Sequence, residues 1–165
     1  MRIMLSVRSA LSDDVAAIVA LMARCRERYE EHQPVFWRRA ADARDRHTEF
    51  IATLVEDEKV IFRVAEREGR FAGFAVGSLV PSPPVYDPGG PTCTLDDFAV
   101  GEDGDWTTVG VDLLKAVTEE ARRRGAVQVV VVCGHMDEAK RQALRARRAL
   151  HRVGVVDRPD LTAPI

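Results

Sequence analysis

The sequence has few cysteines, and their placement excludes two kinds of structural scaffold. Cys25, Cys93 and Cys133 are odd in number, widely separated and form no Cys-x-x-Cys pair. A disulfide framework or a zinc site needs thiols that recur at short spacing. We therefore expect reduced thiols, no metal site and a cytoplasmic location.

Long apolar runs and an excess of basic residues are also missing. No stretch approaches the roughly 18 consecutive apolar residues of a membrane span, and the apolar segment before Arg8 is too short for a signal peptide. The formal net charge is −2, which provides no overall positive field for nucleic acid. We expect neither a membrane nor a nucleic acid as partner.

The composition that is present is that of a globular protein. Apolar residues make up 46% and charged residues 30% of the 165 residues, and no internal repeat or linker interrupts them. A chain of this length closes a core without disulfides or metal. We expect a single domain over residues 1–165.

The first half of the chain predicts antiparallel strands and two helices. Ile3, Leu5 and Val7 alternate with other residues as in a strand with one buried face. Two later apolar runs flank a turn at Gly69 and predict a hairpin. The expected strands cover residues 3–8, 60–65 and 71–77, and the expected helices cover 12–29 and 44–54.

In the second half the pattern changes to that of a parallel unit. A loop rich in proline precedes a strand over 92–100, a helix ends near Gly125, and a nearly all-aliphatic strand covers 127–132. A last helix over 137–152 is expected to turn Ala143 and Ala146 inward. A strand, a crossover helix and a buried strand imply parallel pairing. The fold class is therefore α/β, an α+β mixed sheet with early antiparallel strands and a late parallel β-α-β unit flanked by helices.

The residues after the strand at 92–100 carry a family resemblance. Val100 is followed by a loop, by Gly110 and by the pair Leu113-Leu114. This order resembles the GNAT superfamily of acyl-CoA N-acyltransferases, in which a strand ending in Val precedes Arg/Gln-x-x-Gly-x-Gly/Ala and a helix. Asp105, Thr108 and Gly110 occupy the three motif positions, and only Gly110 matches.

The resemblance extends over most of the chain through the order of its elements. The segment from Leu150 to Val155 is similar to the family's Tyr-x-x-x-Gly-Phe. Leu150 stands where the tyrosine that protonates the leaving thiolate is usual. The resemblance therefore implies the family's fold but a missing general acid.

The resemblance also implies a binding mode for acetyl-CoA. Backbone amides at a helix start are suited to hold a diphosphate, and the pantetheine arm would pair with the strand before it like an added strand. The residues implied in these contacts are Phe98, Ala99, Val100, Thr107, Thr108, Val109, Gly110 and Val111.

Two adjacent acids within this strand are the catalytic candidates. Direct attack on a thioester requires a neutral amine, so a carboxylate or an ordered water must remove a proton. Because neighbours on a strand face opposite ways, only one of Asp96 and Asp97 is expected to face the cleft. The pattern is similar to that of diamine acetyltransferases, which favours Asp96. The alternative is that both acids pair with neighbouring arginines or cap backbone amides.

Three aromatic residues in irregular segments are candidates for binding the acceptor. Phe36, Trp37 and Tyr86 lie where the family walls its acceptor pocket. The alternative for Phe36 and Trp37 is that they fill the gap between the two early helices.

These inferences combine into one functional expectation and one alternative. The expectation is an N-acetyltransferase that transfers an acetyl group from acetyl-CoA to the primary amine of a small molecule by direct transfer, without a metal. The alternative is a catalytically impaired GNAT-fold binding or subunit module, indicated by Asp105, Thr108 and Leu150. The short end after Val155 leaves open a homodimer in which a partner chain completes the sheet edge.

Overall fold

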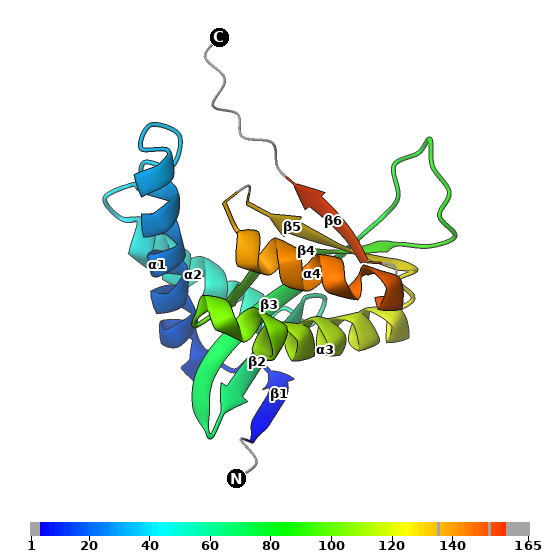
Figure 1. Cartoon of the computed structure of the whole chain (residues 1–165), viewed down its shortest axis with the longest axis horizontal. Helices are drawn as coiled ribbons and strands as arrows, with labels where there is room; N and C mark the ends of the chain where they lie inside the picture. Colours follow the sequence, from blue (N-terminus) through cyan, green and yellow to red (C-terminus); the bar gives the residue numbers. More distant parts are fainter. Residues whose placement is uncertain (1–3, 135, 152, 158–165) are drawn as a thin grey trace.

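The computed structural model describes residues 4–134, 136–151 and 153–157. A six-stranded sheet lies at its centre, and its strand order β1-β2-β3-β4-β5-β6 is that of the chain (Figure 1). The first four strands pair antiparallel, whereas β4, β5 and β6 pair parallel. The predicted mixed sheet is therefore confirmed. The strands are β1 (Leu5–Ser9), β2 (Ile61–Arg67), β3 (Arg70–Val80), β4 (Thr92–Val100), β5 (Gln128–Cys133) and β6 (Val153–Asp157).

Helices cover both faces of the sheet, and the alternation of side chains along the strands explains why. In β2, Phe62 and Val64 are buried in a core with the first two helices, whereas Ile61 and Ala65 are buried in a core with the third and fourth. Side chains two residues apart share a face, so one strand supplies both cores. The helices are α1 (Val15–His32), α2 (Ala43–Glu56), α3 (Val109–Arg123) and α4 (Glu138–His151), and the short 3₁₀ turns are η1 (Ser12–Asp14) and η2 (Asp103–Thr107).

The hairpin between β2 and β3 turns where the sequence predicts it. Glu68 has φ 53° and Gly69 has φ 74°. A two-residue turn with both residues at positive φ matches the twist of the paired strands. Gly69 adopts this conformation without a steric penalty, which explains its place in the turn.

Element boundaries extend beyond the predictions, and one helix face differs from expectation. Helix α1 continues to His32 rather than ending near Tyr29. In α4, Ala143 is buried as predicted, but Ala146 is exposed and Leu144 is buried in its place. Among the side chains of α4 that the structure describes, Lys140, Ala143 and Leu144 are therefore the packed ones.

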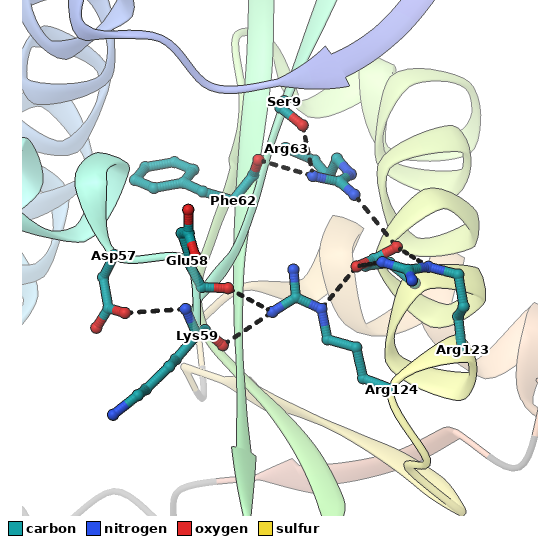
Figure 2. Close-up of polar contacts among 9 residues, drawn as sticks. Ser9, Asp57, Glu58, Lys59, Phe62, Arg63, Arg123 and Arg124 are labelled. Atoms are coloured by element: carbon teal, nitrogen blue, oxygen red, sulfur yellow. Dashed lines mark hydrogen bonds and ion pairs between the residues drawn. The ribbon is translucent and has the colours of Figure 1, made fainter.

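A cluster of charges fixes the C-terminal end of α3 to the sheet (Figure 2). The Glu120 carboxylate accepts hydrogen bonds from Arg123 at 2.6 Å and from Arg124 at 2.6 Å, and Arg63 of β2 lies 3.7 Å away. Arg124 also donates to the carbonyl oxygens of Glu58 at 2.8 Å and Lys59 at 3.1 Å. These cations lower the pKa of Glu120 to about 2. The cluster connects α3 to the segment that leads into β2.

Candidate functional site

The strands β4 and β5 separate halfway along β4. Their parallel pairing runs from Thr92 opposite Gln128 to Leu95 opposite Val131, but β4 continues to Val100. Beyond Leu95, the edge of β4 that faces β5 therefore has no strand partner. A cavity of about 1030 Å³ opens there, lined by residues that include Phe98, Ala99, Val100, Val132 and Gly134.

A bulge in β4 turns two acids toward this cavity. Ala75 pairs with Phe98 and Gly77 with Leu95, so the single residue Val76 of β3 lies opposite Asp96 and Asp97. A two-against-one bulge breaks the alternation of a strand. Both acids line the cavity. The prediction that only one of them would face the cleft was therefore wrong.

The two acids differ in their surroundings. Asp96 is exposed, whereas Asp97 is half-buried. Burial and the charge of Asp96 raise the pKa of Asp97, and the positive charges of Lys140 and Arg26 offset part of this rise. Among the described residues, no hydrogen bond or ion pair reaches the Asp97 carboxylate. A carboxylate with a raised pKa and free oxygens in a cavity is suited to accept a proton.

A buried lysine closes the point at which the two strands diverge. Lys140, from the first turn of α4, is only 4% exposed. Its Nζ donates to the carbonyl oxygen of Phe98 on β4 at 3.1 Å and to that of Val132 on β5 at 3.2 Å. The same ammonium lies 5.2 Å from the ring centroid of Phe98 and 5.3 Å from that of Trp106. Burial lowers the pKa of Lys140, and the two carbonyls and two rings stabilise its charge.

Trp106 separates the start of α3 from the cavity. Its ring packs edge-on against Phe98 at 4.9 Å between centroids, and it lines the cavity. A Cβ added to Gly110 would lie 2.7 Å from the Trp106 ring, so only glycine fits under the indole there. None of Thr107, Thr108, Val109, Gly110 and Val111 lines the cavity. The predicted diphosphate amides therefore lie behind this ring and not on the cavity wall.

Contacts within the η2 turn also engage part of the helix start. The Thr108 amide donates to the Asp105 carbonyl oxygen at 3.2 Å, so this amide is not free as the sequence suggested. The Asp105 carboxylate accepts a hydrogen bond from Arg67 of β2 at 2.6 Å. The ion pair draws the negative charge of Asp105 toward β2 and offsets it. The amides of the first turn of α3 lie before the first intrahelical hydrogen bond, from Asp112 to Thr108.

An aromatic wall forms the other side of the cavity. Tyr29 of α1, Phe36 and Trp37 all line it. The rings of Phe36 and Trp37 meet edge-on at 4.8 Å, and Trp37 lies 5.3 Å from Tyr29. The Tyr29 hydroxyl donates to Asp137, just before α4, at 2.6 Å. Phe36 is 63% exposed and Trp37 38% exposed, so they form a wall rather than a filled gap between helices.

Tyr86 lies away from this cavity. It is 71% exposed and belongs to the loop between β3 and β4. That loop leads into the Thr92 end of β4, whereas the cavity lies at the Val100 end, and the two regions are well separated (Figure 1). The structure does not bring Tyr86 together with Phe36 and Trp37.

Sequence reasoning did not single out three residues of the cavity: Lys140, Arg26 and Tyr29. For two of them, helical spacing could have indicated a position on the packed face of a helix. Lys140 precedes the buried residues Ala143 and Leu144 by three and four positions, which places a lysine on the packed face of α4. Arg26 follows Met22 by four positions on α1 in the same way. A charged residue on a packed face would have indicated a site.

Comparison with known families now gives the class of protein. The sequence pattern of the Acetyltransferase (GNAT) family matches residues 19–152. The chain therefore belongs to the GNAT acetyltransferase family. No curated protein matches the sequence. Within the part of the chain described above, no helix combines the length and apolar character needed to cross a bilayer.

Solved structures with this fold come from several acetyltransferases. A predicted acetyltransferase from Clostridium acetobutylicum, solved with acetyl-CoA, has a TM-score of 0.66 at 15% identity, over 98% of this chain and 96% of that one. The F44R mutant of the BH1408 protein from Bacillus halodurans has a TM-score of 0.77 at 15% identity, over 97% and 99%. The aminoglycoside N-acetyltransferase AAC(6')-Iy in complex with CoA has a TM-score of 0.67 at 13% identity, over 100% and 96%. At these identities the likeness shows the fold.

Proposed function

We propose that the protein is an N-acetyltransferase that passes an acetyl group from acetyl-CoA to the primary amine of a small molecule, by direct attack in a ternary complex. One observation carries the proposal: the free edge of β4 and the bulge that holds Asp96 and Asp97 face the same cavity. Relatives of this fold solved with acetyl-CoA and with CoA support the choice of cosubstrate.

The residues around the diverging strands fit a pantetheine arm. Beyond Leu95, β4 is paired only with β3, so the main-chain groups of Phe98, Ala99 and Val100 on its other edge are suited to strand-like pairing. The start of α3, behind Trp106, contributes amides for a diphosphate. When bound, acetyl-CoA would supply the acyl group as a thioester.

Asp97 is the proton acceptor in this proposal. An ammonium that enters the cavity loses its proton to the Asp97 carboxylate, whose raised pKa improves its match to this task. The exposed Asp96 beside it adds negative charge and raises that pKa further. The aromatic side chains of Phe36 and Trp37 hold the carbon skeleton of the acceptor. Tyr86, which lies away from the cavity, has no contact with the acceptor in this proposal.

The bond changes then need no further group from the chain. The freed amine nitrogen forms a bond to the carbonyl carbon and the carbon–sulfur bond breaks. Water takes the second proton that the nitrogen loses and delivers a proton to the departing thiolate. Leucine has no acidic proton, so Leu150 cannot protonate the departing thiolate. The reaction therefore depends on the CoA thiolate being a fair leaving group without a proton donor from the protein.

A binding or subunit module is the second candidate, because Lys140 already occupies the Phe98 carbonyl oxygen. If that contact does not yield, acetyl-CoA loses the Phe98 carbonyl oxygen as a main-chain partner on β4.

A cytoplasmic location and a homodimer remain predictions from the sequence.

Ligand-dependent thermal unfolding tests the proposal. Acetyl-CoA at about 100 times its dissociation constant should stabilise the chain by about 2.7 kcal/mol. The absence of any shift at millimolar acetyl-CoA would overturn the proposal and favour the module. Where a shift is seen, release of free CoA thiol in the presence of amines separates an enzyme from a binding protein.

A further inference from the structure

The cavity contains one partly buried arginine whose charge no acid neutralises. Arg28 pairs with Asp103 at 3.3 Å, and Arg39 pairs with Glu27 at 3.2 Å and with Glu30. Arg26 of α1 lines the same cavity and is half-buried, yet it forms no ion pair with any acid of the described residues. Its guanidinium is therefore available to an anion that enters the cavity.

The partner that Arg26 does have leaves its positive charge intact. Its Nη1 lies 3.0 Å from Nδ1 of His47 on α2, which also lines the cavity. A guanidinium has only donors, so Nδ1 of His47 accepts this hydrogen bond and the imidazole in this contact is neutral. Burial and the charge of Arg26 lower the pKa of His47 in the same direction. This contact orients Arg26 and uses only one of its five N–H donors.

Asp97 provides the opposite charge in the same cavity. Its carboxylate and the Arg26 guanidinium influence each other electrostatically, but they lie farther apart than an ion pair. The cavity thus presents a carboxylate and a guanidinium that are each unpaired and separated by space. Such a pair is complementary to a molecule that carries an ammonium at one end and an anion at the other.

We infer that the acceptor is an amino acid, whose ammonium meets Asp97 and whose carboxylate meets Arg26. This inference rests on the proposed function and names its substrate class. The half-buried guanidinium of Arg26, with a neutral imidazole beside it, matches the single charge of a carboxylate, whereas Arg38, which also lines the cavity, is exposed to water. The aromatic wall of Phe36, Trp37 and Tyr29 favours an apolar side chain on that amino acid.

Matched acceptors test the carboxylate directly. Phenylalanine, phenylalaninamide and phenethylamine share a ring and a primary amine, but only phenylalanine carries a carboxylate; leucine, leucinamide and isoamylamine form a second series. We expect kcat/KM at least tenfold higher for the amino acid of a series than for its analogues without a carboxylate. Equal or faster acetylation of those analogues would overturn the inference and leave the proposed N-acetyltransferase standing.

Variants of α1 test the role of Arg26. Arg26→Gln should raise KM for the amino acids at least tenfold and leave KM for the amides and simple amines unchanged, because only the carboxylate loses its partner. The control is Arg24→Gln, an exposed position on the same helix and outside the cavity. A purely structural role of Arg26 would raise KM for acceptors with and without a carboxylate alike, and that result would overturn the inference.

A binding measurement keeps the inference testable if no acetylation is detected. Calorimetry with phenylalanine and leucine should show binding to the wild-type chain and at least tenfold weaker binding to the Arg26→Gln variant. Failure of both amino acids to bind the wild type, with and without CoA, would overturn the inference. Binding of amino acids without any response to acetyl-CoA would instead overturn the proposed function and, with it, the role of the amino acid as acceptor, and would leave only an amino-acid site between Asp97 and Arg26.

Discussion

The Nζ of Lys140 donates to the carbonyl oxygen of Phe98 at 3.1 Å across the point at which β4 and β5 separate. The contact joins the first turn of α4 to the free edge of β4. It therefore occupies a main-chain acceptor that a strand-like ligand would use. A ligand that pairs with this edge has to displace the ammonium or bind beside it.

Lys140→Met is expected to tighten the binding of acetyl-CoA. The methionine fills a similar volume but cannot donate to Phe98, so the ligand no longer competes with an internal hydrogen bond. One hydrogen bond from a charged donor contributes about 1.5 to 3 kcal/mol, which corresponds to roughly tenfold to a hundredfold in affinity. Calorimetry with acetyl-CoA measures the change.

Lys115→Met is the control for this experiment, because Lys115 is exposed on α3 and outside the cavity. It should bind like the wild type. Weaker binding by Lys140→Met, with its circular dichroism unchanged, would mean that the ammonium contacts the ligand instead of competing with it.

Asp97→Asn should reduce kcat about 100-fold or more and leave the affinity for acetyl-CoA nearly unchanged, because a general base acts on the amine. Asp96→Asn should reduce kcat less than tenfold. In the wild type, kcat/KM should increase with pH. The midpoint of this increase should lie above the pKa of an ordinary carboxyl group, because the pKa of Asp97 is raised.

The same pair of variants yields a second pH signature. Removal of the Asp96 charge lowers the pKa of Asp97, so the acidic limb of the Asp96→Asn profile should move to lower pH. Identical profiles and equal losses in both variants would argue against Asp97 as the base.

Gly110→Ala should destabilise the chain by about 1 to 3 kcal/mol, because the new methyl group would lie 2.7 Å from the Trp106 ring. Urea unfolding followed by far-ultraviolet circular dichroism measures this loss. At Gly104, in the preceding η2 turn, an added methyl group meets no atom within 4 Å, so Gly104→Ala should unfold near the wild-type midpoint. A Gly110→Ala midpoint equal to that of Gly104→Ala would show that the indole moves without cost.

Glu120→Gln should lower the free energy of unfolding by about 1 to 2 kcal/mol at neutral pH. This loss is smaller than the full pKa shift implies, because water screens the exposed Arg123. The folded pKa of about 2 lies below the ordinary value of 4.5, so the stabilisation is present above pH 4.5 and disappears as the pH falls toward 2. Wild type and variant should therefore converge in acid. A difference that persists unchanged at pH 2 would assign the loss to packing.

The sequence predicts the elements of this fold because its patterns are local. The alternation in β1, the turn at Gly69 and the aliphatic run in β5 each depend on a few neighbouring residues. The candidate site was predicted only in part, because two of its features depend on pairing between distant segments. The bulge at Asp96 and Asp97 can be recognised only from the pairing of β4 with β3. The position of Trp106 depends on the packing of η2 against the start of α3, where the indole contacts Gly110.

Trp37 and Trp106 are the only tryptophans in the chain, and both line the cavity, one on the exposed aromatic wall and the other buried beside Lys140. The tryptophan fluorescence of the protein therefore arises entirely from this one region. A ligand that fills the cavity should change the emission without any added dye, and replacing either indole with phenylalanine would show from which side the change comes.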